Sequence, residues 1–376
     1  MFIDIALQND IIDDGVINAV ILALRSNNVL FNKHANPVVY QQLANRIYSK
    51  NMDNIDPAKK AVLYANLVGA SSVFESGETL STFEKEILHL INLIENQKKY
   101  GELFFVYAHM CQFYLLLGDF KEAKKYAEKA QKYIDCADNI FSLFRYWYAR
   151  AWLCYELRDI DAGIKALDNY TKLISSSQCL SPVGKLFARD LSIKFKILMK
   201  KKEEAQKELE ETIKDAKAYH NNVPSGVLGE LEYTKTLLYF QSGQYELAKD
   251  QCNHALNILT KVFGGDIIDL TQAHIHIMLG EIEEEKGNYN LALEEYRRVL
   301  KFYDEKSYGR VNHFHEYGEL LANLCTIYYK QKNYLESKFY FQKLVANFGL
   351  DHEIVEKLIK KLPVEYMYQI SGNVEK

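Results

Sequence analysis

A motif that recurs every 40 to 45 residues constrains this chain more than any other feature of its sequence. It is clearest in four segments: "LLGDFKEAKKYAEKAQ" (116–131), "QSGQYELAKDQCNHAL" (241–256), "EKGNYNLALEEYRRVL" (285–300) and "KQKNYLESKFYFQKLV" (330–345). The turns of the successive copies begin at Gly118, Arg158, Gly243, Gly287 and Lys332, with a weaker turn near Lys200. A repeat of this period predicts one supersecondary unit that buries its apolar face only by stacking on the next copy.

Each copy reads as two helices joined by the turn. An aromatic or aliphatic residue stands four positions before most turns, as Tyr114, Tyr239 and Tyr328 do. A small residue follows five positions after each turn: Ala123, Gly163, Ala205, Ala248, Ala292 and Ser337. The next apolar residues recur every three or four positions, which is the spacing of one buried helical face. Because two closely crossing helices leave room only for a small side chain, the pattern predicts a tight helical hairpin.

Composition supports an all-helical chain. All five prolines fall between the periodic segments, where they do not interrupt a helix. The net charge of −4 gives no electrostatic reason to expect nucleic acid or an anionic membrane as a partner. No apolar stretch reaches the roughly 18 to 20 residues that span a bilayer. The six cysteines show no metal-site or disulfide spacing, and the acidic N-terminus does not resemble an export signal, so we expect a cytoplasmic location.

The repeat resembles the tetratricopeptide repeat. One copy carries its pattern as Gly280, Tyr289, Ala292 and Tyr296, and another as Cys325, Tyr328, Tyr334, Ser337 and Phe341. The resemblance covers residues 104–350 in six copies. These copies are longer than the usual repeat of about 34 residues, and are similar to those of kinesin light chains and of Gram-positive peptide-pheromone receptors of the Rap and PlcR type. The resemblance implies an all-α, right-handed superhelical solenoid in which the first helix of each hairpin lines the concave surface.

Three regions are expected along the chain. Residues 1–60 do not fit the period and predict an N-terminal helical cap or a small effector segment. This region is poor in basic residues and shows no helix-turn-helix pattern, so we do not expect it to bind DNA. Residues 61–350 form the array of about seven hairpins, the first of them degenerate. Residues 351–376 form a capping helix and a tail.

The cysteines and histidines of this chain, which in other proteins serve in catalysis or metal binding, are explained by their packing positions in the repeat. Cys111, Cys154, Cys252 and Cys325 stand at packing positions of the repeat and behave as small apolar residues. The histidines of "HIH" (274–276) and "HFHE" (313–316) are two positions apart, so on a helix they diverge by about 200° and cannot share a metal ion. We therefore predict neither an enzyme nor a cofactor or metal site, with a metal bound across two hairpins as the alternative.

The resemblance also implies which side chains line the concave surface. The predicted binding residues are Arg145, Tyr148, Trp152, Tyr155, Lys194, Tyr233, Phe240, Glu281, Asn323, Thr326 and Tyr329. The same correspondence adds His109, Gln112, Glu230 and Glu284. Aromatic rings mixed with amides and with charges of both signs suit a peptide whose backbone is held by amides and whose side chains are held by rings. Alternatively, some of these rings pack against the next hairpin.

Two kinds of function fit these expectations. The first is an intracellular regulatory receptor whose groove binds a peptide or partner segment and whose superhelix tightens or loosens on binding. The second is a static adaptor, or a pathogen effector, that acts through protein–protein interactions. Ligand-dependent compaction distinguishes a receptor from a static adaptor.

Overall fold

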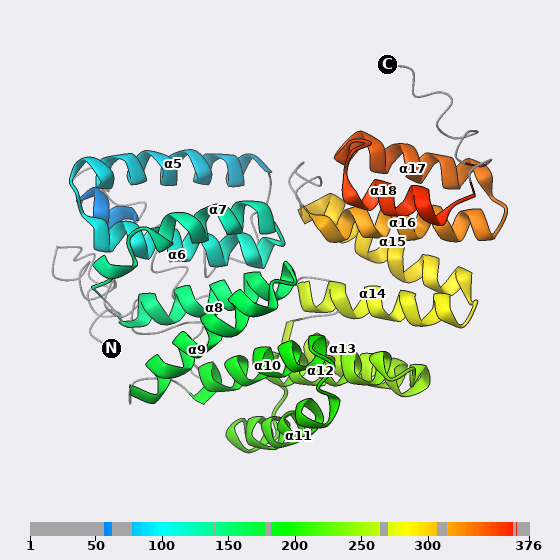
Figure 1. Ribbon diagram of the computed structural model, residues 1–376, viewed down its shortest axis with the longest axis horizontal. Coiled ribbons are helices and arrows are strands. Elements are labelled where there is room, and N and C mark those ends of the chain that lie inside the picture. Colours follow the sequence, from blue (N-terminus) through cyan, green and yellow to red (C-terminus); the bar gives the residue numbers. More distant parts are fainter. Residues whose placement is uncertain are drawn as a thin grey trace, which may run out of the picture. The chain divides into compact units, whose positions relative to one another are not determined.

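The computed structural model describes residues 56–61, 77–138, 140–176, 182–263, 270–306, 314–363 and 366. Within these ranges the protein consists of α-helices and one short 3-10 helix, with no strand, as Figure 1 shows. The predicted all-α fold is therefore confirmed. Almost all of the 1–60 segment lies outside the described residues, as does much of the expected first hairpin. None of the described helices combines the length and the apolar character needed to cross a membrane.

The chain divides into two compact units, residues 1–223 and 224–376. The boundary follows α11 and lies inside the range expected to form one array. Two consecutive left-handed residues, Asn221 and Asn222, precede Pro224 at this point. The helices of the first unit are α5 (Gly77–Asn96), α6 (Tyr100–Leu117), α7 (Phe120–Gln131), η3 (Ile134–Cys136), α8 (Ile140–Glu156), α9 (Ile160–Ser176), α10 (Pro182–Leu198) and α11 (Lys202–Tyr219). Those of the second unit are α12 (Gly226–Gln241), α13 (Tyr245–Phe263), α14 (Leu270–Glu285), α15 (Tyr289–Lys306), α16 (His315–Lys330), α17 (Tyr334–Phe348) and α18 (Glu353–Lys361).

All six predicted turns join the two helices of a hairpin. The hairpins are α6–α7, α8–α9, α10–α11, α12–α13, α14–α15 and α16–α17. Each turn contains one left-handed residue, which is glycine in three of them, as at Gly287 with φ of 79°. The other three turns use Arg158, Lys200 and Lys332, with φ between 58° and 61°. A left-handed backbone costs about 1–2 kcal/mol for a residue with a Cβ, so these three turns depend on the packed helices on either side.

The small residue after each turn lies at the point of closest packing. Ala123, Ala248 and Ala292 are fully buried. Gly163 is tighter still, because a Cβ there would lie 2.1 Å from Cζ of Phe195 on α10. The ring of the following hairpin therefore occupies the space that a side chain at position 163 would need. At Gly163 the limit on size is thus set by the following hairpin, whereas the sequence pattern predicted a limit set by the partner helix of the same hairpin.

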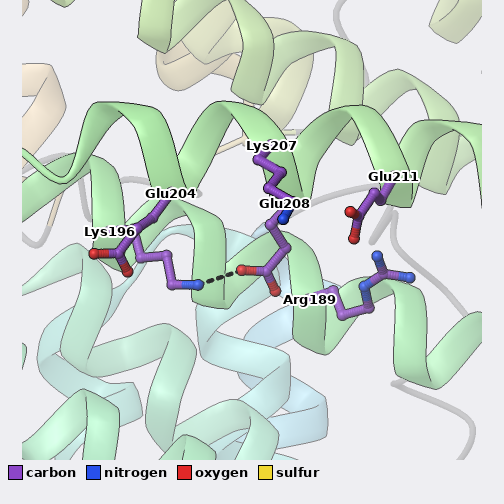
Figure 2. Close-up of a pocket in the computed structure, with 6 residues that line it drawn as sticks. All are labelled: Arg189, Lys196, Glu204, Lys207, Glu208 and Glu211. Carbon is purple, nitrogen blue, oxygen red and sulfur yellow. Dashed lines mark hydrogen bonds and ion pairs between the residues drawn. The ribbon is translucent and has the colours of Figure 1, made fainter.

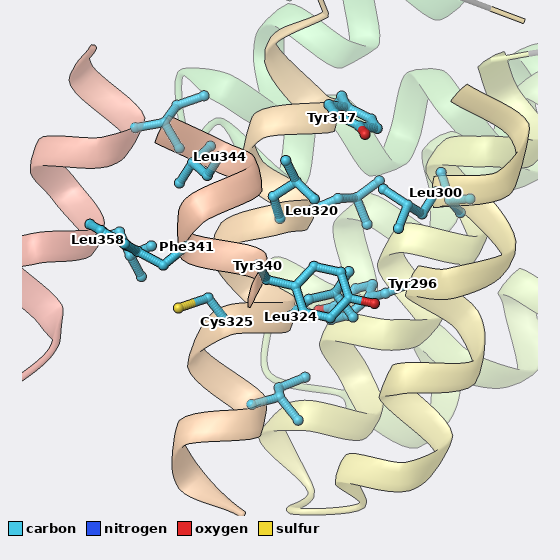
Figure 3. Packing of buried hydrophobic residues seen from close by; sticks show 14 of the residues in the cluster. Tyr296, Leu300, Tyr317, Leu320, Leu324, Cys325, Tyr340, Phe341, Leu344 and Leu358 are labelled. Carbon is cyan, nitrogen blue, oxygen red and sulfur yellow. The ribbon is translucent and has the colours of Figure 1, made fainter. Parts of the chain in front are cut away.

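The core of the second unit shows how neighbouring hairpins stack. Figure 3 shows Tyr296 and Leu300 of α15 close to Leu320 and Leu324 of α16, with Phe341 of α17 beyond them. These side chains are buried in one continuous cluster. The short helix α18 packs on α16 and α17 through Ile354, Val355 and Leu358. It therefore buries an apolar face of the last hairpin that would otherwise be exposed.

Candidate peptide-binding surface

Four of the predicted binding residues lie along α8 of the first unit. Arg145, Tyr148, Trp152 and Tyr155 are spaced by three and four positions, which places them on one face of the helix. Each of them is half-buried, as is Lys194 on the neighbouring helix α10. We call these five residues the first-unit patch.

The rings of the first-unit patch contact one another and the next hairpin. The ring centroid of Tyr148 lies 6.4 Å from that of Trp152 and 6.4 Å from that of Phe187 on α10. Trp152 donates a hydrogen bond from Nε1 to Oε1 of Glu156 at 2.8 Å. These aromatic residues thus pack between hairpins, as the alternative for the rings predicts, while part of their surface stays exposed.

Two cations of the first-unit patch are held by side chains of the same unit. Arg145 donates a hydrogen bond to the amide oxygen of Gln112 on α6. Burial lowers the pKa of Arg145 to about 10, so the guanidinium remains charged at neutral pH. Lys194 lies 2.8 Å from the carboxylate of Asp190, and both side chains are largely buried. The helices α6, α8 and α10 therefore hold charged groups in fixed positions beside the rings.

Tyr155 of the first-unit patch packs against the following hairpin. Its ring meets Phe195 of α10 edge-on at a centroid distance of 5.8 Å. The guanidinium of Arg158 lies 5.2 Å from the centroid of the Tyr155 ring. Burial raises the pKa of Tyr155. This ring joins the α8–α9 turn to the following helix.

The remaining predicted residues lie on α12, α14 and α16 of the second unit. We call the set the second-unit patch: Tyr233, Phe240, Glu281, Asn323, Thr326 and Tyr329. Tyr233 is buried, and its ring centroid lies 6.2 Å from that of His274 on α14. Phe240 contacts Tyr245 across its own hairpin turn at 5.5 Å. Thr326 donates its hydroxyl to the backbone oxygen of Ala322 at 2.8 Å.

Glu281 gives the second-unit patch an acidic centre. Burial, together with the nearby carboxylates of Glu319, Glu284 and Glu285, raises the pKa of Glu281 to about 7. Glu284 is also bound by Lys330 of α16 at 2.9 Å. A carboxyl group that titrates near neutral pH can change its charge when a ligand or a change of pH alters its surroundings.

The two histidine segments meet across the second unit. Nε2 of His274 lies 2.7 Å from Oε1 of Glu316, and Tyr303 donates a hydrogen bond to the other oxygen of this carboxylate. Burial acts to raise the pKa of Glu316, but the His274 charge and hydrogen bond outweigh it and lower the pKa. His276 makes a separate contact of 2.6 Å with Glu295. His274 thus pairs with a carboxylate of the next hairpin, and His276 pairs with a carboxylate of its own hairpin.

A family model of the tetratricopeptide repeat matches residues 106–134 and residues 273–305. The first match spans most of the α6–α7 hairpin, and the second spans most of α14 and α15. The chain carries tetratricopeptide repeats. The predicted resemblance is therefore confirmed for the repeat itself.

A solved structure shares this repeat fold, and two more show a weaker likeness. A crystal structure of a Rap protein complexed with competence and sporulation factor is 14% identical, with a TM-score of 0.56 over 92% of this chain and 98% of that chain. The apo form of RapI is 12% identical, with a TM-score of 0.48 over 95% and 98% of the two chains. Aspartyl phosphate phosphatase F from Bacillus subtilis is 11% identical, with a TM-score of 0.46 over 92% and 96%. No curated protein matches the sequence. At such identity, the likeness to the first structure shows the fold alone.

Sequence reasoning missed several neighbours of the two patches. The resemblance implies groove positions for His109 and Gln112, but both side chains are buried, and Nδ1 of His109 lies 3.0 Å from the backbone oxygen of Phe105. Asp190, the partner of Lys194, could have been found from the helical spacing of four residues. Contacts between repeats, such as that of His274 with Glu316, carried no local signal in the sequence.

A charged hollow on the α10–α11 hairpin lies apart from the predicted residues. Figure 2 shows its lining of Arg189, Lys196, Glu204, Lys207, Glu208 and Glu211. Lys196 pairs with Glu208 within the hollow, and Arg189 lies 2.6 Å from Asp215. Its alternating charges belong to the segment 199–215 and the helix before it, where the repeat presents a solvated helical face.

Proposed function

We propose that this repeat protein binds a peptide or a partner segment through the first-unit patch and the second-unit patch, and acts as an intracellular regulatory receptor without catalysis of its own. The observation that carries the proposal is the first-unit patch. There, half-buried rings on one face of α8 lie beside a charged guanidinium and a fixed Lys194–Asp190 pair. Partly buried aromatic residues next to fixed polar groups are typical of surfaces where a few residues supply most of the binding energy.

The second-unit patch supports the same proposal with different chemistry. Asn323 supplies an amide that can bond a peptide backbone, and Glu281 supplies a carboxylate that can hold a cationic side chain. The Rap protein of similar fold was crystallised as a complex with competence and sporulation factor, so the same fold holds a ligand in that protein. From this likeness in fold we infer that the present chain also binds a ligand.

The proposal can be tested with random short peptides displayed on messenger RNA and selected on the immobilised protein. Trp152 is one of two tryptophans, so a Trp147→Phe background makes its emission a specific reporter. A selected peptide should shift Trp152 emission with a saturable dependence on concentration. Selected peptides that bind without changing Trp152 emission, and with unchanged affinity for Trp152→Ala, would place binding away from the first-unit patch and contradict the proposal.

A scattering measurement tests the receptor part of the proposal. A receptor whose superhelix responds to its ligand should change its radius of gyration when the selected peptide saturates it. An unchanged radius of gyration at saturation would instead favour the static adaptor.

A further inference from the structure

Tyr366, a residue from beyond the repeats, covers the last hairpin. Its side chain is 5% exposed, and its ring centroid lies 4.6 Å from that of Tyr329 and 5.5 Å from that of Tyr334. Its hydroxyl donates a hydrogen bond to the backbone oxygen of Tyr334 at 3.4 Å. Tyr329 belongs to the second-unit patch. One of the side chains expected to meet a ligand is therefore already covered by the protein itself.

In earlier hairpins, the small residue that follows the turn is covered by the first helix of the next hairpin. Phe195 of α10 covers Gly163 in the first unit. In the second unit, Ala248 shares a buried cluster with Ile282 of α14, and Ala292 shares one with Ile327 of α16. Each covering residue comes five positions before its own turn, so the arrangement repeats along the array.

Ser337 is the corresponding small residue of the last hairpin, and no further hairpin follows it among the described residues. Its hydroxyl donates to the backbone oxygen of Cys325 at 2.8 Å. Tyr366 reaches the same place: burial raises the pKa of Tyr366, while its interaction with the Ser337 side chain opposes that rise. Tyr366 thus takes the position that a following first helix occupies elsewhere.

The last hairpin is covered by the single side chain of Tyr366, which makes fewer contacts than the following helix that covers an earlier hairpin. A following helix is held by several buried residues, whereas here one ring makes the contact. Helix α18 is anchored separately by Ile354, Val355 and Leu358, which are buried where α18 packs on α16 and α17. Tyr366 can therefore leave without the loss of α18.

We propose that Tyr366 is a reversible closure of the second-unit patch, which must move aside before a ligand contacts Tyr329. This inference rests on the proposed function, because it describes how access to the same surface is controlled. When only the open fraction of a protein is competent to bind, the apparent affinity falls by that fraction. The closure therefore sets how tightly a peptide that uses Tyr329 can bind.

The first test measures exposure of Tyr329 in the protein without ligand. Nitration by tetranitromethane, followed by peptide mapping, should modify Tyr329 about fivefold faster or more in Tyr366→Ala than in the unaltered protein. Tyr366→Phe keeps the ring and should behave like the unaltered protein. Tyr366→Leu keeps apolar bulk, and it replaces the alanine variant if circular dichroism shows loss of helix. Equal rates of Tyr329 nitration in the unaltered protein and the variant would overturn the closure.

The second test uses a random-library peptide selected on Tyr366→Ala whose binding is lost in Tyr329→Ala. It should bind Tyr366→Ala about fivefold more tightly or better than the unaltered protein and Tyr366→Phe. Equal affinity for all three proteins would overturn the closure and leave the proposed function standing. If selection on these proteins yields no binding peptide at all, the proposed function itself fails and the closure fails with it.

Discussion

Corresponding positions in the first helices of two hairpins, counted back from the turns at Arg158 and Gly287, carry different side chains in the two units. On α8 of the first unit they hold Arg145, Tyr148 and Trp152, and on α14 of the second unit they hold His274, Ile277 and Glu281. Both helices precede the same left-handed turn and lie in hairpins closed by a small residue, Gly163 or Ala292. The repeat therefore fixes its turns and closest contacts, while these positions are left free to vary. The first unit combines rings with cations, and the second combines an acidic centre with paired histidines.

The largest expected effect concerns the closest contacts of the two units. Gly163→Ala places a Cβ against Phe195, whereas Ala292 already accommodates one. We expect Gly163→Ala to lower the free energy of unfolding by about 1–3 kcal/mol, and Ala292→Gly by about 1 kcal/mol, through helix propensity alone. Urea denaturation measures both changes. If Gly163→Ala were neutral, the contact of position 163 with Phe195 would not limit the packing at that position.

The second prediction concerns the acidic centre and pH. Glu281 has a folded-state pKa of about 7, above its ordinary value of 4.5. The folded state thus holds this proton more tightly than the unfolded state, and the resulting stability is lost as pH rises from about 4.5 through about 7. Glu281→Gln should therefore stabilise the protein by about 1–3 kcal/mol near pH 8 and by little near pH 5.

Thermal unfolding across this pH range checks the Glu281 prediction. The exposed Glu305→Gln on α15 serves as a control that should leave the pH profile of stability unchanged. A stability difference between Glu281→Gln and the unaltered protein that does not vary with pH would show that the acidic centre does not hold a proton in the folded state.

The smallest expected effect concerns the turns. Lys200 in the first unit is left-handed with φ of 60°, where Gly243 stands in the second unit with φ of 69°. Lys200→Gly should raise the free energy of unfolding by at most about 1 kcal/mol, because relief of the left-handed strain is partly offset by the flexibility of glycine. Gly243→Ala should lower it by about 1 kcal/mol. Changes of the same sign in both variants would mean that the two turns are not equivalent.

Features set by short stretches of chain could be predicted from the sequence. A turn followed by a small residue five positions later recurs in each copy, so the turn at Gly287 and the small residue at Ala292 were recognisable without a structure. The placement of Tyr148 on a ligand-facing side of α8 came from the resemblance to the tetratricopeptide repeat, and its contact with a ligand stays a prediction.

Features that depend on how hairpins stack could not be predicted in this way. Arg145 meets Gln112, and His274 meets Glu316, only because helices from different repeats lie side by side. The sequence positions of such partners are set by the stacking register, which local periodicity does not contain. The same applies to Tyr366, whose contact with Tyr329 requires the chain to return to the last hairpin after α18.

The most direct test of the central claim, that the first-unit patch and the second-unit patch bind a peptide, is the affinity of a library-selected peptide for Trp152→Ala and Asn323→Ala. Each variant should bind several-fold more weakly, since loss of a contact residue at the centre of an interface typically costs about 1–2 kcal/mol or more. Phe339→Ala, which removes a ring that is 54% exposed on α17, serves as the matched control and should bind as the unaltered protein does. Unchanged affinity in both groove variants, with helical circular dichroism preserved, would contradict the claim.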